Sequence, residues 1–475
     1  MNQLFILFLS SLGFINAQVY DGYTLFTPMS AFDDNATTYL MNNDYEFLHT
    51  WTHDQGPASM PYLLADSTII YPYRVEFPSM EAGGVGGGIQ KQSWDGEILW
   101  EYEFANEQYQ HHHDVEPLPS GNILIIVWEK KTAQEAYDMG RETIDNPLNV
   151  MWSMALLELE PESGEIVWEW HIWNHTIQDI YTELPNYGII SDHPELFDIN
   201  RGPVGNVAGG PQGANGDWMH INAVDYNPIL DQIVISSRTQ NEIFIIDHST
   251  STEEAASHSG GNSNQGGDFL YRWGNPENYG RGDEADRILG DQHSINWIPA
   301  GYPGEGNLIL FNNFHEGNNS AVLEFTPPLV GNNYTINDGA SFGPETWEWI
   351  YTGDITTPLQ GGAFRLPNGN TLITQTHTAT VIEIDSEGNK LWSFTHVGES
   401  GSYWIARCEK YSSDYLMDFM LGDLNGDGTL NILDIVILAN LILSGDTSNP
   451  AGDLNQDGSQ NILDIVILIN LILNS

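Results

Sequence analysis

The sequence predicts an all-β fold, a six-bladed β-propeller closed by a shared terminal blade, followed by a small α-helical calcium-binding domain. Three features indicate it. A strand-turn-strand unit recurs between positions 19 and 419, a strand with alternating aromatic residues completes most units, and an acidic loop is duplicated after position 420. The 47 glycines and abundant aromatic residues also favour strands and tight turns over helices.

The recurring unit begins with two short strands joined by a turn rich in Pro, Asn and Gly. It is found at 115–126, 295–310 and 363–373. A third strand follows the strand pair, as at 243–247 and 381–385. Short strands joined by turns of this composition form antiparallel hairpins.

A fourth strand carries aromatic residues at alternate positions, at 99–102, 167–170, 347–349 and 391–394. Four antiparallel strands with a periodic aromatic motif are typical of a propeller blade. Complete blades are therefore expected at 57–105, 111–174, 218–275, 292–352 and 361–396.

The remaining strand-like segments lie at the two ends of this region. We expect residues 403–407 to supply inner strands of a sixth blade, and residues 38–40 and 45–51 to supply its outer strands. A blade made from both ends leaves no open sheet edge on the ring. The alternative is a seven-bladed ring, because segment 175–217, interpreted as a loop, is long.

The first residues predict export. Residues 4–17 are mostly apolar, too short to cross a bilayer and closed by Ala17, which is typical of a secretory signal peptide over 1–17. The alternative is a buried first strand. No later segment is apolar for long enough to span a membrane, so we expect a secreted, periplasmic or cell-surface protein with a propeller over 18–420 and a tail domain over 421–475.

The charge balance excludes several kinds of partner. The formal net charge is -51, from 14 Lys and Arg against 65 Asp and Glu residues. Such a chain repels phosphate backbones and anionic lipid, which argues against binding to nucleic acid or to a membrane surface. The single cysteine, Cys408, cannot form a disulfide within the chain.

The acidic loop at 423–434 recurs at 453–464. Oxygen-bearing side chains at alternating positions, with Gly at position 6 for the sharp turn, match a calcium loop, whereas an acidic solvated turn is the alternative. The expected calcium ligands are Asp423, Asn425, Asp427, Thr429, Asn431 and Asp434 in the first copy and Asp453, Asn455, Asp457, Ser459, Asn461 and Asp464 in the second.

One apolar helix is expected after each loop, at 435–443 and 465–473. The duplicated loop and helix resemble a type I dockerin domain over roughly 421–473. The resemblance implies calcium binding and a cohesin-like or cell-surface partner.

Histidine falls repeatedly at the head of an inner strand, as His113, His220 and His293. Inner strands line the channel of a propeller, so these side chains are expected to converge near one axis. The fifth blade has Gly361 at this position but offers His377 just after its second strand. Converging imidazoles can act as acid, base, nucleophile or metal ligand; the alternative is half-buried histidines bonded to backbone carbonyls.

The positions of the few arginines determine where an anionic substrate could bind. Arg238 ends a strand, Arg365 lies in an inner strand and Arg407 lies in the closing blade. A chain this acidic can hold an anion only where its rare guanidinium groups gather. Alternatively, these arginines bridge neighbouring blades through Asp or Glu. Motifs for a P-loop, a dinucleotide-binding turn or an HExxH zinc site are missing, so no nucleotide cofactor is expected.

Several segments together resemble the bacterial arylsulfate sulfotransferases over most of 44–415. The most distinctive have the forms Trp-x-His-x-Asn and Leu-Pro-Asn-Gly-Asn-Thr-Leu-Ile. The similar segments are 217–226, 235–238, 292–293, 310–313 and 365–373. The resemblance implies a six-bladed propeller that moves a sulfuryl group from a phenolic ester to another phenol through a sulfohistidine, without a nucleotide.

The resemblance also implies roles for individual residues. By order along the chain, His377 matches the nucleophile, and His220 and His293 the supporting pair. The substrate would be an aryl sulfate or another sulfated small molecule. The remaining candidates for charge stabilisation are His113, Asn222, Arg238 and Arg365.

Two other functions stay open at this point, because a propeller fold alone does not fix an activity. One is a non-catalytic propeller that binds sulfated glycans or protein. The other is a secreted enzyme that degrades polysaccharide, a common companion of dockerin tails.

Overall fold

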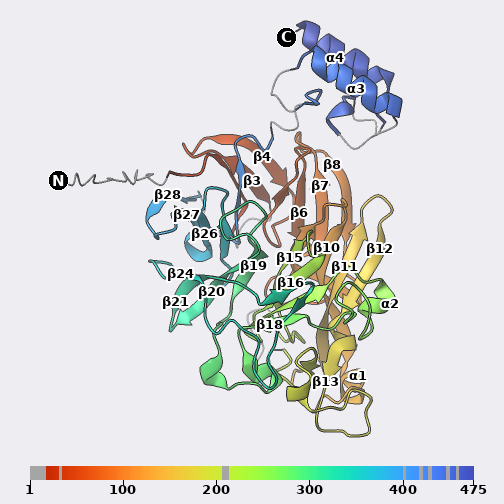
Figure 1. The fold of residues 1–475 in the computed structure, drawn as a ribbon, viewed down its shortest axis with the longest axis vertical. Helices are drawn as coiled ribbons and strands as arrows, with labels where there is room; N and C mark the ends of the chain where they lie inside the picture. Colours follow the sequence, from red (N-terminus) through yellow and green to blue (C-terminus); the bar gives the residue numbers. More distant parts are fainter. Residues whose placement is uncertain are drawn as a thin grey trace, which may run out of the picture.

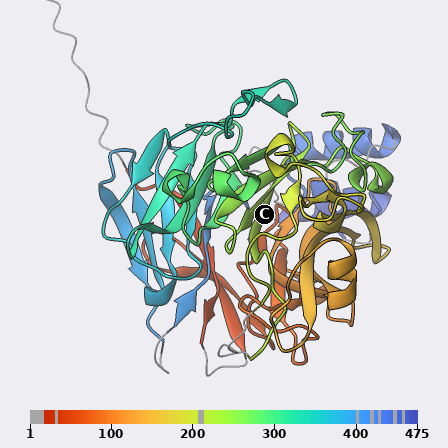
Figure 2. The ribbon, with the colours of Figure 1, turned by 90° about the horizontal axis from the view of Figure 1, so that it is seen from below.

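The computed structural model describes residues 18–30, 35–205, 213–398, 403–416, 421–425, 430–444, 450–455 and 459–474. Six four-stranded antiparallel sheets are set around a common centre (Figures 1 and 2). The predicted six-bladed all-β propeller is confirmed. The expected signal peptide at 1–17 lies outside the described residues.

Five blades are formed by consecutive stretches of chain, each with its first strand innermost and its last at the rim. They correspond to the five predicted units. Their strands are β5 (Tyr62–Leu63), β6 (Ile69–Arg74), β7 (Gly87–Gln92) and β8 (Ile98–Glu103); β9 (Tyr109–Pro117), β10 (Ile123–Thr132), β11 (Val150–Glu160) and β12 (Glu165–His171); β15 (Ile221–Asn227), β16 (Gln232–Ser237), β17 (Glu242–Asp247) and β18 (Tyr271–Trp273); β19 (His293–Trp297), β20 (Leu308–Glu316), β21 (Asn319–Phe325) and β24 (Trp349–Tyr351); and β25 (Gly362–Arg365), β26 (Thr371–Gln375), β27 (Thr380–Ile384) and β28 (Lys390–Thr395).

The sixth blade is shared by the two ends of the propeller, as predicted. Its order is β30 (Glu409–Ser412), β1 (Gly22–Phe26), β3 (Ala36–Met41) and β4 (Phe47–His53). The innermost strand is β30 and not residues 403–407. Within that segment β29 (Trp404–Ile405) pairs with β2 (Pro28–Met29) in a separate ribbon.

The tryptophans of the aromatic strands explain why the motif recurs. In five places an indole N–H donates across the seam to an oxygen of the next blade, so each Trp both fills the seam and satisfies its own donor. The pairs are Trp51 with Ser93, Trp168 with Thr250, Trp273 with Pro344, Trp349 with Ser386, and Trp392 with Asn43, at 2.8–3.2 Å.

The long segment after β12 is not a seventh blade. Its described part contains the short helices η1 (Ile172–His175) and η2 (Ile190–Asp192), and β13 (Thr176–Ile177) pairs in parallel with β14 (Phe197–Asp198). The other short elements are α1 (Ala133–Asp138), α2 (Thr252–Ala255), η3 (Pro276–Tyr279), η4 (Glu284–Asp286), the hairpin β22 (Leu329–Val330) and β23 (Asn333–Tyr334), η5 (Thr376–Thr378) and η6 (Pro450–Gly452).

The tail contains α3 (Ile432–Ser444) and α4 (Ile462–Asn474), which pack side by side (Figure 1). Leu438 and Leu468 are fully buried between them. Among the described residues, none of the helices is long and apolar enough to cross a membrane.

A buried ion pair links the closing strand to its neighbours. The Lys410 ammonium lies 2.8 Å from Glu383 Oε2, and neither side chain is exposed. Glu383 Oε1 also accepts from the backbone N–H of Tyr20 and from Asn370 Nδ2, both at 2.6 Å. One carboxylate therefore ties the N-terminal segment and the C-terminal strand to the fifth blade.

Removal of the Lys410 ammonium should destabilise the closed ring. We expect Lys410→Met to lower the free energy of unfolding by about 3–5 kcal/mol, because Glu383 is left buried without its counter-charge. The matched control is Lys91→Met, since Lys91 pairs with Asp66 in a partly exposed bridge and its loss should cost about 0–1 kcal/mol. Denaturant unfolding of both variants tests this. Equal losses would contradict it.

Candidate active site

Three predicted histidines meet at the heads of inner strands. His113 lies in β9, His220 directly precedes β15, and His293 is the first residue of β19. The ring centroids of His113 and His220 are 4.6 Å apart, nearly perpendicular. Burial lowers the pKa of His113 most, and the nearby His220 and His293 act in the same direction. Side chains from three blades therefore form one cluster.

The backbone has an unusual, left-handed conformation where these histidines lie. His113 and His220 have φ values of 57° and 49°, and Ser294, next to His293, has 56°. Strand pairing shifts register at all three places. A left-handed backbone is costly for a residue with a side chain and persists where the surrounding structure imposes it, often at functional sites.

An aspartate orients His220. Asp217 Oδ2 lies 2.5 Å from His220 Nδ1, and Asp217 Oδ1 accepts from Trp128 Nε1 at 3.0 Å. A carboxylate only accepts, so Nδ1 of His220 carries a proton, and in the neutral ring Nε2 holds the lone pair. His112 stacks on Trp128, with centroids 4.1 Å apart, and its Nδ1 lies 2.8 Å from His113 Nδ1. The roles of Asp217 and Trp128 were not predicted.

His293 is held in one tautomer. The backbone N–H of Gln360 donates to Nε2 at 3.3 Å, so Nδ1 carries the proton and donates to Asn313 Oδ1 at 2.8 Å. Asn313 Nδ2 in turn donates to the carbonyl of Thr357 at 2.8 Å. Asn313 is thus a positioning residue that the histidine pattern alone does not reveal.

His377 lies in η5, half-buried, with its ring centroid 5.2 Å from that of Trp404. Its Nδ1 is 2.8 Å from the hydroxyl of Thr357, which donates to the carbonyl of Leu359. That hydroxyl therefore accepts from Nδ1–H, and Nε2 of His377 holds a lone pair. Thr357 and Asn313 lie between His377 and His293; the structure links these two histidines but gives no direct contact between them.

Burial favours the neutral form of His113, His293 and His377. Burial lowers the pKa of His113 well below its usual value, and His220, His112 and His293 act in the same direction. Burial also lowers the pKa of His293 to about 3 and lowers that of His377. A neutral imidazole has the lone pair that a nucleophile or a base needs.

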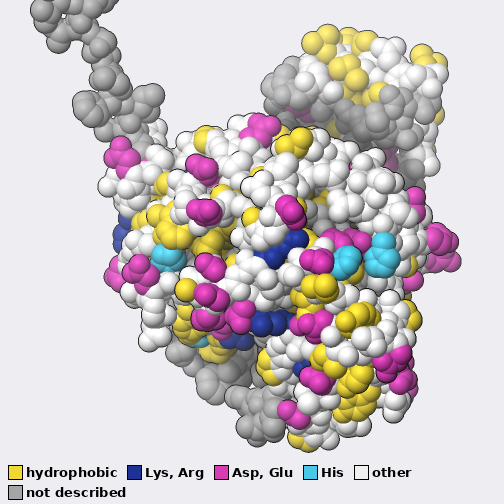
Figure 3. Space-filling model, turned by 60° about the horizontal axis from the view of Figure 1, so that its bottom comes forward, with side chains coloured by type: hydrophobic (Ala, Val, Ile, Leu, Met, Phe, Trp, Pro, Cys, Tyr) yellow, Lys and Arg dark blue, Asp and Glu magenta, His cyan; other side chains and the backbone are white. Residues whose placement is uncertain are grey.

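Two further predicted residues lie near the cluster. Asn222 is buried and donates from Nδ2 to the carbonyl of Gln292 at 2.7 Å, while its Oδ1 has no hydrogen-bond partner among the described residues. Arg238 pairs with Asp291 and is partly exposed. Burial is the main cause of the low pKa of His293, and the charge of the nearby Arg238 adds to it. One face of the molecule shows Lys and Arg to be few and set among Asp and Glu (Figure 3).

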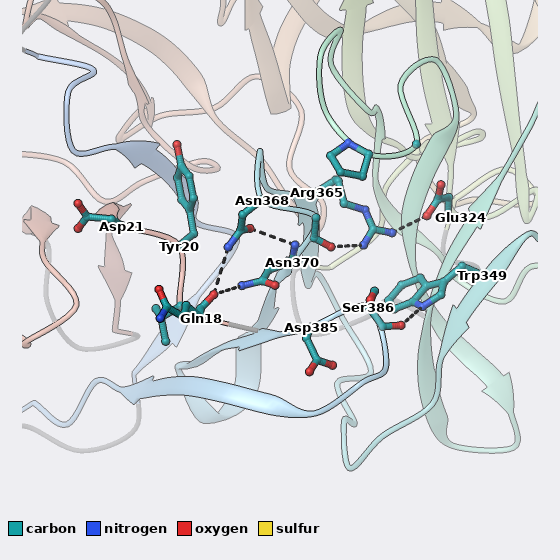
Figure 4. Close-up of a pocket in the computed structure, with 14 residues that line it drawn as sticks. Gln18, Tyr20, Asp21, Glu324, Trp349, Arg365, Asn368, Asn370, Asp385 and Ser386 are labelled. Atoms are coloured by element: carbon teal, nitrogen blue, oxygen red, sulfur yellow. Dashed lines mark hydrogen bonds and ion pairs between the residues drawn. The ribbon is translucent and has the colours of Figure 1, made fainter. Parts of the chain in front are cut away.

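Arg365 is not brought to the histidines. It lies at the other end of inner strand β25, where it pairs with Glu324 of the neighbouring blade and stacks on Trp349 at 4.8 Å. There it lines a cavity of about 1070 Å³ (Figure 4). Across that cavity the carbonyl of Gln18 accepts from Asn370 Nδ2 at 2.8 Å. Arg365 therefore bridges two neighbouring blades through a carboxylate, which was the alternative interpretation of the arginines.

Acidic side chains gather further along the inner strands. Arg407 pairs with Asp114, and burial raises the pKa of Glu116 well above its usual value, with Asp225 and Asp114 adding to it. Burial raises the pKa of Asp225 to about 7, and Glu409 acts in the same direction. Burial therefore favours the uncharged form of Glu116, and Arg407 balances the charge of Asp114.

The two acidic loops of the tail share one arrangement. Asp434 and Asp464, at the last loop position, are fully buried. Their Oδ1 atoms accept from the backbone N–H of Leu424 and Leu454, both at 2.9 Å. Each carboxylate thus ties the start of its loop to the first turn of the following helix.

Buried carboxylates beside other loop oxygens fit a hard cation such as calcium. Asp423 is buried at the start of the first loop. The other predicted ligands that the structure describes are Asn425, Asn431, Asp453, Asn455, Ser459 and Asn461, whereas Asp427, Thr429 and Asp457 lie outside the described residues.

The site predicts an acid-sensitive fold. His293 has a pKa of about 3 in the native state against about 6.5 when unfolded, so between these values only the unfolded chain binds the proton and stability falls as pH falls. From pH 7 to pH 5 this amounts to about 2 kcal/mol for one such group. His293→Gln should therefore lose less stability on acidification than the wild type, measured by denaturant unfolding.

His171 provides a control of opposite sign. Although burial lowers its pKa, the hydrogen bond that His171 donates to Glu129, with the charge of that carboxylate, raises it overall. Its stabilising effect is present below pH 6.5 and is lost as pH rises through the raised native value. His171→Gln should make the protein more sensitive to acid. If both variants followed the wild-type pH profile, this assignment would be wrong.

Comparison with known proteins agrees with these features. The family model described as Arylsulfotransferase (ASST) matches residues 82–349, and that of the type I dockerin domain matches 421–473. No curated protein matches the chain.

Several solved structures are similar in part. A protein of unknown function from Bacteroides caccae has 12% identity and a TM-score of 0.42, over 82% of this chain and 98% of that one. A putative 6-phosphogluconolactonase from Bacteroides fragilis has 9% identity and a TM-score of 0.38, over 83% and 98%. Apo AztD from Citrobacter koseri has 9% identity and a TM-score of 0.35, over 82% and 98%. Similarities at this level carry no argument about function.

The family match covers more than half of the chain, and the six blades and the duplicated loop-helix tail agree with the two matches. The protein belongs to the arylsulfotransferase family and carries a type I dockerin domain.

Proposed function

We propose that the chain is a secreted transferase that moves a sulfuryl group between phenolic esters and phenol acceptors through a sulfohistidine. Its dockerin domain, over 421–475, would tether the propeller, over 18–420, to a cohesin-like or cell-surface partner. The observation that carries the proposal is the convergence of histidines from separate blades in a member of this family.

In the first half of the reaction, His377 is the proposed nucleophile. Its Nε2 lone pair attacks sulfur, the S–N bond forms, and the bond from sulfur to the aryl oxygen breaks as phenolate leaves with the electron pair. Thr357 supports this role because it fixes the tautomer. The groups proposed to stabilise charge on the sulfuryl oxygens are Arg238, His113 and Asn222.

In the second half, a phenol must lose its proton as it attacks the sulfohistidine. His220 is suited to take this proton, because Asp217 holds Nδ1–H and leaves Nε2 free to accept. The same group can return the proton to the leaving phenolate. No nucleotide is needed, since the donor ester itself supplies the sulfuryl group.

An aromatic surface lies beside the nucleophile. Trp404, next to His377, is 41% exposed and lines a cleft of about 880 Å³ together with Met29, Tyr73 and Phe77. Exposed aromatic rings can stack on the ring of a phenolic substrate. The cleft therefore supports an aryl donor over an aliphatic one.

One observation favours the alternative of glycan binding without catalysis. The cavity between the fourth and fifth blades combines Trp349 with Arg365, Asn368 and Asp385. Aromatic and planar polar side chains together suit a sugar. Its arginine is already neutralised by Glu324, however, which weakens recognition of a sulfate group.

Transfer from 4-nitrophenyl sulfate to phenol tests the proposal. The wild type should release nitrophenolate and form phenyl sulfate, and intact-mass analysis of the quenched protein should show one added SO₃. His377→Ala should lose the adduct and lower kcat by about 10⁴-fold or more. His220→Ala should retain the adduct and slow its transfer to phenol.

The matched control is His315→Ala, a half-buried histidine beside Trp347. It should keep wild-type activity. An adduct mapped to His220 instead would overturn the assignment of His377, and no nitrophenolate release by the folded protein would favour binding without catalysis.

Calcium should order the tail independently of this chemistry. Because loop carboxylates repel one another without a cation, chelation should reduce the helix signal of α3 and α4 and leave the propeller intact. Hydrogen exchange on the full chain, with and without chelator, resolves the two parts. Asp434→Ala should reproduce the effect in the first loop alone, and unchanged exchange in residues 421–473 would contradict the assignment.

A further inference from the structure

A second group of potential ligands lies at the rim of the ring, in a region that the proposed reaction does not use. His175 ends η1, after β12, while His258 and Asp268 belong to the segment between α2 and β18. Ligand atoms of the three residues all lie within 4.8 Å of one another. Asp268 Oδ1 is 2.7 Å from His175 Nδ1 and 2.8 Å from His258 Nδ1.

The hydrogen bonds of His175 fix its tautomer. Its Nε2 lies 2.8 Å from the carbonyl oxygen of Ala255, which only accepts, so Nε2 carries the proton. In the neutral ring Nδ1 then holds a lone pair, and this lone pair faces a carboxylate oxygen of Asp268. Two acceptors at this distance require a cation between them, either a proton or a metal ion.

The surroundings hold the ring of His175 and the backbone beside Asp268. The His175 ring is fully buried and parallel to that of Trp170, with centroids 5.6 Å apart. Trp170 Nε1 donates to the carbonyl of Gly267 at 2.7 Å, which fixes the residue preceding Asp268. A bonded second ring nitrogen and an ordered carboxylate are the outer support that metal-ligating histidines normally have.

The third ligand leaves a route from solvent. The His258 side chain is 62% exposed, against 8% for Asp268. Movement of His258, together with rotation of the Asp268 carboxylate, would widen both present spacings of 2.8 and 2.7 Å to the roughly 3.4 Å that two ligands about 2.1 Å from a tetrahedral ion require. An ion could therefore enter without unfolding the blade.

We propose that His175, His258 and Asp268 bind a divalent transition-metal ion of the zinc type, with water in the fourth position. Two imidazole nitrogens and one carboxylate suit zinc, whereas calcium takes six to eight oxygen ligands. The ion fixes segment 252–268 of the third blade to η1 at the end of the second. This site is independent of the proposed transferase activity.

Titration of the untagged full chain in calcium-containing buffer, followed by calorimetry, tests the site. Zinc should bind at one site that His258→Ala weakens by about tenfold or more, and cobalt should give a tetrahedral absorption band that the variant lacks. His258 is exposed, so its variant should fold; Asp268→Asn is the second variant and should also lose the band.

The control is His193→Ala, another exposed histidine that pairs with Glu195 on the neighbouring segment. It should retain zinc affinity and the cobalt band. Zinc binding that is equal in the wild type and His258→Ala, or a wild type that binds no zinc, would overturn the proposal and leave a protonated histidine–aspartate pair at this place.

Discussion

The whole molecule depends on closing the ring. Pairing of β30 with β1 joins residues almost four hundred positions apart, and the buried Lys410–Glu383 pair holds this blade against its neighbour. Each inner strand is also bonded to the next, as where Asn296 Nδ2 donates to the carbonyl of Ala363 at 3.0 Å. Because the candidate active site takes its histidines from several blades, it exists only in the closed ring.

The architecture could be predicted because it is periodic. A turn, a strand pair and an aromatic strand recur in each blade. The indole N–H bonds between blades explain why aromatic residues recur at these positions. Strand identity at the closure could not be predicted. Residues 403–407 and 409–412 are both short, and only the three-dimensional pairing shows that Glu409 lies opposite Leu25.

The site could be predicted in part for the same reason. His113, His220 and His293 hold equivalent positions in their blades, so the repeat itself brings them together. Asp217 and Thr357 lie outside the blade strands, and Asn313 lies in β20; all three act by fixing tautomers, which leaves no periodic trace in the sequence. The sequence gives no reason to treat Arg238 and Arg365 differently. They differ because they lie at opposite ends of their blades, Arg238 near the histidines and Arg365 away from them.

The acidic residues along the inner strands have a consequence for the charge inside the ring. Burial favours the uncharged form of Glu116 and raises the pKa of Asp225 to about 7, while Arg407 balances Asp114. Each of these carboxyl groups that ionises adds negative charge to the interior. The inner strands therefore carry a dependence on alkalinity that is separate from the protonation of the histidines.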